Sequence, residues 1–170
     1  MNAPKSEAPP RQPAGLLPYR DIHVKLSNRF EPNTTYCDHF EAQGRVITGV
    51  GLAVGEHEPD ARATLWIYEN QRPGRAPGQV LRKVQVPLPA LVSPDVSVIR
   101  IEAFFKVPVA LEPGQDRFWV GFQFSGKTTL AVDVEKQFVG VRRDAAGAES
   151  FARALERPLL YVRYAGKKYS

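Results

Sequence analysis

The sequence has little of the chemistry that enzymes and metalloproteins use. Cys37 is the only cysteine among 170 residues, so no disulfide can form within the chain. Stability must come from a hydrophobic core or from association, and such a chain suits a reducing compartment. Only three histidines are present, which leaves few candidates for a general base. We therefore predict that the protein is not an enzyme and carries no cofactor.

Long hydrophobic runs are also missing. No stretch reaches the roughly 18 apolar residues of a membrane helix, and the first 20 residues lack the apolar segment of a secretion signal. We expect a protein without a membrane span that is cytoplasmic or carried within a particle. The 23 Lys and Arg residues exceed the 18 Asp and Glu residues, but both signs are interspersed. Without a basic run or a recognition motif, the sequence does not predict nucleic-acid binding.

Proline, by contrast, is abundant, and five of the 15 prolines lie within the first 18 residues. Proline fixes φ and lacks a backbone donor, so residues 1–20 are predicted to form an extended arm outside the sheets. A disordered leader is the alternative. The candidate interaction residues of the arm are Pro9, Pro10, Pro13, Leu16, Leu17 and Tyr19.

From residue 21 onward, short runs of alternating apolar and polar residues are separated by turn residues, which is typical of a sandwich or barrel. The connections are too short for parallel strands. Residues 21–170 are therefore predicted to form one all-β domain, an antiparallel β-sandwich of jelly-roll-like type. Only DAAGAESFARALER, residues 144–157, has helical composition, and Gly147 limits it to about two turns.

Three segments form a further pattern, ATLWIYENQRPGRAPGQVL, FFKVPVALEPGQDRFWVGFQF and PLLYVRYAG, and the match spans roughly residues 46 to 165. The pattern resembles the lectin-like β-sandwich modules of the choice-of-anchor and cleaved-adhesin type in bacteria. The matching residues are Pro77, Gly78, Val80, Leu81, Leu111, Gly114, Phe118, Trp119, Val120 and Gly121. The resemblance implies a non-catalytic accessory role in adhesion or carbohydrate binding.

The segment GFQFSGKT, residues 121–128, satisfies the phosphate-loop pattern G-x-x-x-x-G-K-[ST]. A phosphate loop must open a helix, whose N-terminal amides meet the phosphates. Here TTLAVDVE follows, and it alternates like a strand. We therefore predict a hairpin turn at residues 125–127, and nucleotide binding is kept only as a remote third hypothesis.

Two places could contribute metal ligands. Cys37 and His39 are two residues apart on a predicted strand and so share a face, but two ligands do not make a zinc site. His57 lies among the acidic residues of GEHEPDA, where oxygen ligands could hold calcium, but a solvated loop is the simpler interpretation. We predict no metal site, and we expect Cys37 to be a small buried residue.

Alternation along DRFWVGFQF assigns the core face of a strand. The predicted core residues are Phe118, Val120, Phe122 and Phe124. Trp119 points to the opposite face, where its ring could be exposed.

The segment ATLWIYEN presents Trp66 and Tyr68 on the face opposite Leu65 and Ile67, and either pair could be inward. An exposed aromatic ring beside polar groups can stack on a sugar or anchor a protein interface. Trp66, Tyr68 and Trp119 are therefore the candidate ligand or interface residues. The alternative is that these rings lie beneath a loop or the arm.

Two functional hypotheses follow. The first is a structural interaction protein, a subunit or decoration of a larger assembly such as a virus particle, in which the arm extends over a neighbour and the partners include copies of the chain itself. The second is a carbohydrate-binding or adhesion module that recognises glycans.

Overall fold

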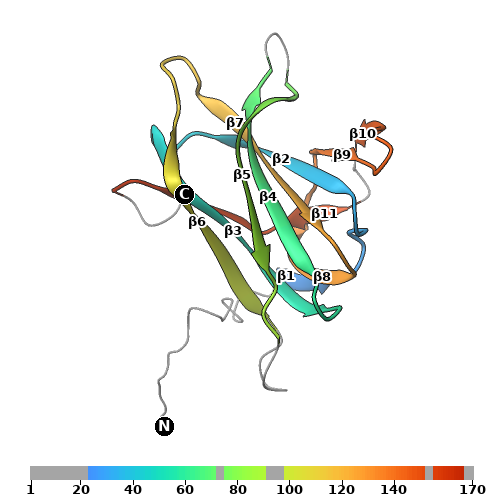
Figure 1. Ribbon diagram of the computed structural model, residues 1–170. Coiled ribbons are helices and arrows are strands. Elements are labelled where there is room, and N and C mark those ends of the chain that lie inside the picture. The colour runs from blue at the N-terminus through green and yellow to red at the C-terminus, as the bar shows by residue number, and fades with distance from the viewer. Residues whose placement is uncertain (1–22, 72–74, 91–97, 152–154, 167–170) are drawn as a thin grey trace.

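The computed structural model describes residues 23–71, 75–90, 98–151 and 155–166. Over these residues the protein is all-β, with two antiparallel six-stranded sheets packed face to face (Figure 1). The predicted β-sandwich class is confirmed. The predicted arm, with Pro9, Pro10, Pro13, Leu16, Leu17 and Tyr19, lies outside the described residues. In the described part of the chain, no helix is long and apolar enough to cross a membrane.

Sheet 1 contains β1 (Val24–Ser27), β3 (Val46–His57), β6 (Ile99–Ala110), β8 (Thr128–Gln137), β11 (Glu156–Pro158) and β12 (Leu160–Tyr164). One edge of β3 pairs with β6, and the other pairs with β12 and, near its end, with β8. β11 pairs with β8 beyond that point. The segment β11–β12 therefore fills the fork where β3 and β8 diverge.

Sheet 2 has the strand order β10 (Glu149–Phe151), β9 (Val141–Arg143), β2 (Thr35–Glu41), β7 (Arg117–Phe124), β4 (Arg62–Asn70) and β5 (Pro77–Pro87). These strands bring together residues far apart in the sequence, because β2 and β7 are paired at the centre of the sheet. The candidate aromatic residues all lie on the central strands β4 and β7.

The helix predicted within residues 144–157 is wrong. Where the structure describes this segment, a tight turn joins β9 to β10, and β11 follows. Asp144 Oδ1 accepts hydrogen bonds from the N–H groups of Ala146 and Ala148, and Gly147 has a φ of 91°. An aspartate that binds nearby amides favours a turn over a helix, and this local preference overrides the helical composition.

The hydrophobic core lies between the sheets and uses alternate residues of each strand. The predicted core face of β7 is confirmed by its buried side chains, Phe118, Val120, Phe122 and Phe124. In β4, Leu65 and Ile67 belong to the same core. Because successive residues of a strand point to opposite faces, Trp66 and Tyr68 point outward, which decides between the two predicted orientations.

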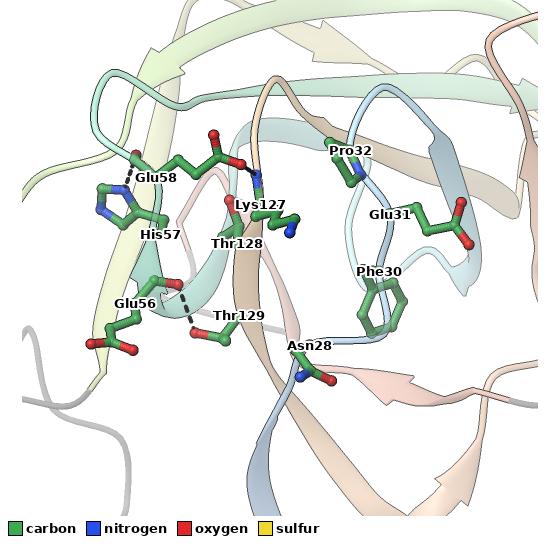
Figure 2. Close-up of a pocket in the computed structure, with 10 residues that line it drawn as sticks. All are labelled: Asn28, Phe30, Glu31, Pro32, Glu56, His57, Glu58, Lys127, Thr128 and Thr129. Atoms are coloured by element: carbon green, nitrogen blue, oxygen red, sulfur yellow. Dashed lines mark hydrogen bonds between the residues drawn. The ribbon is translucent and has the colours of Figure 1, made fainter.

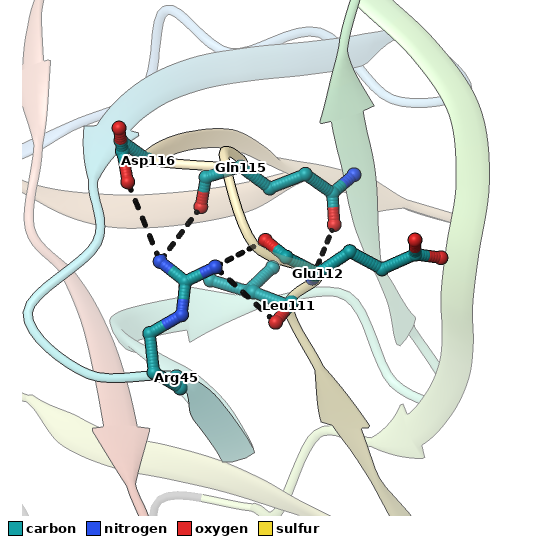
Figure 3. A network of polar contacts seen from close by, with 5 residues as sticks. All are labelled: Arg45, Leu111, Glu112, Gln115 and Asp116. Atoms are coloured by element: carbon teal, nitrogen blue, oxygen red, sulfur yellow. Dashed lines mark hydrogen bonds and ion pairs between the residues drawn. The ribbon is translucent and has the colours of Figure 1, made fainter.

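Arg45, immediately before β3, forms hydrogen bonds with the turn between β6 and β7 (Figure 3). One guanidinium nitrogen donates to the carbonyl of Gln115 at 3.1 Å and lies 3.4 Å from Asp116 Oδ1. The other donates to the carbonyls of Leu111 and Glu112. A planar guanidinium can satisfy several acceptors at once, so this turn is held firmly at the start of β7.

Candidate functional site

The outer face of sheet 2 carries a second apolar cluster, separate from the core between the sheets. We call this cluster, formed by Cys37, Trp66, Tyr68, Trp119 and Val141, the outer aromatic face. Strand register brings its members together, since Cys37 and Trp66 both lie opposite Gly121. Tyr68 lies opposite Trp119 in the adjacent row. The structure thus unites the three aromatic residues that the sequence singled out.

Gly121 allows the aromatic rings to lie against the sheet. A Cβ atom at this position would lie 2.7 Å from Tyr68 Cε2, 3.2 Å from Cys37 Sγ and 3.5 Å from Trp66 Cε3. Two of these distances are too short for relaxed contacts, so only glycine leaves room for the rings. The rings of Trp66 and Tyr68 lie 6.2 Å apart between centroids with an interplanar angle of 26°. They form a nearly parallel pair above the backbone of β7.

Trp119 points outward as predicted, and of the two alternatives left open by the sequence, an exposed ring and a covered ring, the structure shows the covered one. Its side chain is 2% exposed. Its Nε1 donates a hydrogen bond to Asn70 Oδ1 at 2.9 Å, and the His39 ring lies 4.9 Å away. Alternation correctly assigned the face of the sheet, but it could not reveal that neighbouring strands cover the ring. Trp119 is therefore a covered member of the cluster, beside Tyr68.

Trp66 is the most accessible ring of the cluster. It is half-buried, whereas Tyr68 is 5% exposed. Lys83 Nζ lies 5.8 Å from the Trp66 ring centroid, and Val80, opposite Tyr68 on β5, is 49% exposed. Beside the outer aromatic face, an accessible strip therefore extends from Trp66 on β4 to Val80 and Lys83 on β5.

A row of uncharged polar side chains crosses the sheet beside Trp66. We call it the polar row, and it consists of Thr35, Gln123, Thr64 and Gln85. The Thr35 hydroxyl donates to Gln123 Oε1 at 3.4 Å, and Gln85 Nε2 donates to the Thr64 hydroxyl at 3.4 Å. These residues were not predicted from the sequence, although Thr64 precedes Trp66 by two positions and Gln123 follows Gly121 by two. The period of a strand could have placed them on the same face.

Burial suppresses ionisation in the cluster. It raises the pKa of the Cys37 thiol to about 12 and lowers the pKa of His39 to about 4, where Arg75 and Arg117 add to the effect. At neutral pH the cluster thus holds a protonated thiol, and the neighbouring His39 ring is an uncharged imidazole. Among the residues that the structure describes, no group of three or more His, Cys, Asp or Glu side chains could hold a metal ion.

GFQFSGKT does not form the predicted hairpin. It runs from β7 in sheet 2 to β8 in sheet 1, so residues 125–127 connect the two sheets. The Lys127 N–H donates to Glu58 Oε1 at 2.8 Å, and the Glu58 N–H donates to the Lys127 carbonyl at 2.9 Å. The Glu58 carboxylate therefore already accepts the hydrogen bond from one of the backbone amides that a phosphate would need. A strand follows this connection in place of the helix. The geometry does not fit a phosphate loop.

The same connection borders a pocket of about 570 Å³ at one end of the sandwich (Figure 2). Its lining residues are Asn28, Phe30, Glu31, Pro32, Glu56, His57, Glu58, Lys127, Thr128 and Thr129. The Thr129 hydroxyl donates to the Glu56 carbonyl at 2.9 Å, and both ring nitrogens of His57 face backbone carbonyls. These polar groups thus make contacts within the turns that surround the pocket.

No protein-family model matches the chain, and neither curated proteins nor solved structures give a match. The resemblance to choice-of-anchor and cleaved-adhesin type modules therefore stays a prediction. The functional argument rests on the residues of this chain.

Proposed function

We propose that this protein is a non-catalytic interaction protein, a subunit or decoration of a larger assembly such as a virus particle. It docks through its N-terminal arm and a surface of the sandwich. The observation that carries the proposal is the second apolar cluster on the outer side of sheet 2, which lies apart from the core. A partner that covers Trp66 and Val80 would remove this accessible apolar surface from water.

The composition of the cluster supports protein docking. Tryptophan and tyrosine contribute most of the binding energy at many protein interfaces, especially where neighbouring side chains hold them in place. Trp66 has such support, because Tyr68 lies beside it and Trp119 is anchored by Asn70 in the adjacent row. A ring that is already fixed loses little entropy when a partner binds.

The environment of the reactive side chains supports a non-catalytic role. The Cys37 thiol is buried and stays protonated at neutral pH. The carboxylate of Asp38 is buried and paired with Arg157 at 2.9 Å. The two nitrogens of His57 lie 2.9 and 2.7 Å from the carbonyls of Glu58 and Pro89. Asp38 and His57 are thus engaged in contacts within the fold and Cys37 is buried, which leaves these groups poorly placed to act on a substrate.

Deletion of residues 1–20 tests this proposal. The truncated chain should keep the far-ultraviolet circular dichroism of the sandwich, with a melting temperature within a few degrees of the full chain, because the core lies in later residues. Its native mass, measured by light scattering, should fall to that of a monomer. A truncated chain that associates as strongly as the full chain would contradict a role for the arm.

Carbohydrate binding is the second candidate, and the polar row favours it. An indole ring can stack on a sugar, while neighbouring hydroxyl and amide groups bind its hydroxyls. Thr64 and Gln85 are suitably placed beside Trp66 on β4 and β5. A glycan array with the wild-type protein and Trp66→Ala provides the test. Glycan binding that depends on Trp66 would favour this candidate, and the absence of any glycan ligand would remove it.

A further inference from the structure

Trp66 presents a supported aromatic surface on the outside of sheet 2. Its ring and that of Tyr68 are nearly parallel, with an interplanar angle of 26°, and both rings pack close to Gly121. On the neighbouring strand, Val80 is 49% exposed and Lys83 lies opposite Trp66. The accessible strip is therefore apolar at its centre and is bordered by hydrogen-bond donors.

These donors suit a ligand with unpaired backbone carbonyls. Gln85 Oε1 accepts a hydrogen bond from Arg62 at 3.0 Å, which directs the Gln85 amide nitrogen toward Thr64. Lys83 adds an exposed ammonium group. A polyproline II helix makes no internal hydrogen bonds, so its carbonyls remain available to such donors. Proline-rich segments of this form bind protein surfaces lined by aromatic side chains.

The chain itself contains a proline-rich segment of the kind that forms a polyproline II helix. Residues 8–13 read APPRQP, in which Pro10 and Pro13 have the P-x-x-P spacing. Residues 14–22 separate Pro13 from the first described residue, and in polyproline II form these nine residues would span about 28 Å at about 3.1 Å per residue. A globular domain of 170 residues has a radius of gyration of about 15 Å. The spacer is therefore long enough to place residues 9–13 on the outer aromatic face of a copy that packs directly alongside.

We propose that the outer aromatic face receives the proline-rich segment Pro9–Pro13 from the arm of a second copy, with Trp66 as the central contact. This inference rests on the proposed function, because it names the surface onto which the arm docks. In a dimer with two-fold symmetry the exchange is reciprocal, and each copy donates one arm and receives one.

Two variants of the full chain separate the donor from the acceptor. Pro9, Pro10 and Pro13 are all replaced by alanine in the first, which keeps the receiving face. The second is Trp66→Ala, which keeps the arm. Sedimentation velocity over a range of concentrations should show that each variant associates at least about tenfold more weakly than the wild type. An equimolar mixture should form a mixed dimer, because an intact arm then meets an intact face.

A second pair of variants tests the receiving strip even if Trp66→Ala fails to fold. Val80→Glu places a charge on the receiving strip, and Val107→Glu places the same charge on an exposed position of β6 in the other sheet. Both valines are exposed, so both variants should keep the wild-type circular dichroism. Val80→Glu should weaken association, and Val107→Glu should leave it unchanged.

The outcomes distinguish the two proposals. If the arm variant loses association while Trp66→Ala and Val80→Glu retain it, the arm docks elsewhere, which overturns this inference and leaves the proposed function standing. If the wild type is a monomer at every concentration, arm exchange between copies is wrong. If Trp66 is needed for glycan binding and not for association, the outer aromatic face belongs to the carbohydrate-binding candidate.

Discussion

Arg157 in β11 donates a hydrogen bond from Nε to Oδ2 of Asp38 in β2 at 2.9 Å, and this ion pair joins the two sheets. The Asp38 side chain is 1% exposed, and that of Arg157 is 34% exposed. The second carboxylate oxygen of Asp38 accepts the N–H of His39 at 2.9 Å. A buried carboxylate is costly unless it is paired and hydrogen-bonded, so this contact allows a charge inside the sandwich.

Removal of Arg157 should therefore destabilise the fold. Arg157→Ala leaves the Asp38 carboxylate buried without its cation, and we expect the free energy of unfolding to fall by about 3 kcal/mol in urea titrations. Arg142→Ala is the control, because Arg142 pairs with the exposed Glu31 at 3.4 Å and should cost less than about 1 kcal/mol. Equal losses in the two variants would show that the inter-sheet pair is no more important than a surface contact.

The lack of a side chain at position 121 should be essential for the outer aromatic face. Gly121→Ala places a methyl group 2.7 Å from Tyr68 Cε2, and such overpacking should cost about 1–3 kcal/mol. The tryptophan fluorescence should change, since Trp66 lies beside the new methyl group. At Gly126 the nearest atom to an added Cβ is 3.4 Å away, so Gly126→Ala should be milder. A milder effect of Gly121→Ala would contradict the packing described.

Replacement of Trp119 should lower the free energy of unfolding as much as replacement of a buried core residue does. Phe122→Ala is expected to cost about 3–5 kcal/mol, the range for removal of a large buried aromatic side chain. Because Trp119 is also buried and loses its hydrogen bond to Asn70, we expect a similar cost for Trp119→Ala. Thermal and urea unfolding of both variants measure this, and a loss below 1 kcal/mol for Trp119→Ala would argue against its burial.

Acid should weaken the fold through His39. Burial lowers the pKa of His39 from its ordinary 6.5 to about 4. Between these values the unfolded chain binds a proton that the folded chain does not, so the contribution of His39 to stability is full above pH 6.5 and is lost as the pH falls toward 4. The melting temperature of His39→Gln should decrease less than that of the wild type over this interval. Parallel curves would rule out the effect.

The thiol of Cys37 should be inert in the folded protein. Burial raises its pKa to about 12, and the thiolate is the form that reacts. A thiol reagent at pH 8 should therefore label almost none of the native protein and one thiol per chain in denaturant. Rapid labelling of the native protein would show that the outer aromatic face opens readily.

Period-two alternation identified the all-β class and the core face of β7, because burial of one face of a strand imposes that pattern directly. It could not foresee that Trp119 is covered, since the covering groups come from β2 and β4. The sequence predicts a hairpin at residues 125–127 because a short turn between two strands has the same residues whether the strands pair or enter different sheets. Strand pairing is a long-range property that local residues do not encode.

The path of β11–β12 through sheet 1 has a consequence for biosynthesis. Residues 156–164 occupy the fork between β3 and β8, although both of those strands precede them in the sequence. During translation, β3 and β8 leave the ribosome before the segment that must separate them. Sheet 1 is therefore completed only after nearly all of this sequence has emerged, and until then the fork exposes unpaired backbone edges that chaperones or aggregation can capture.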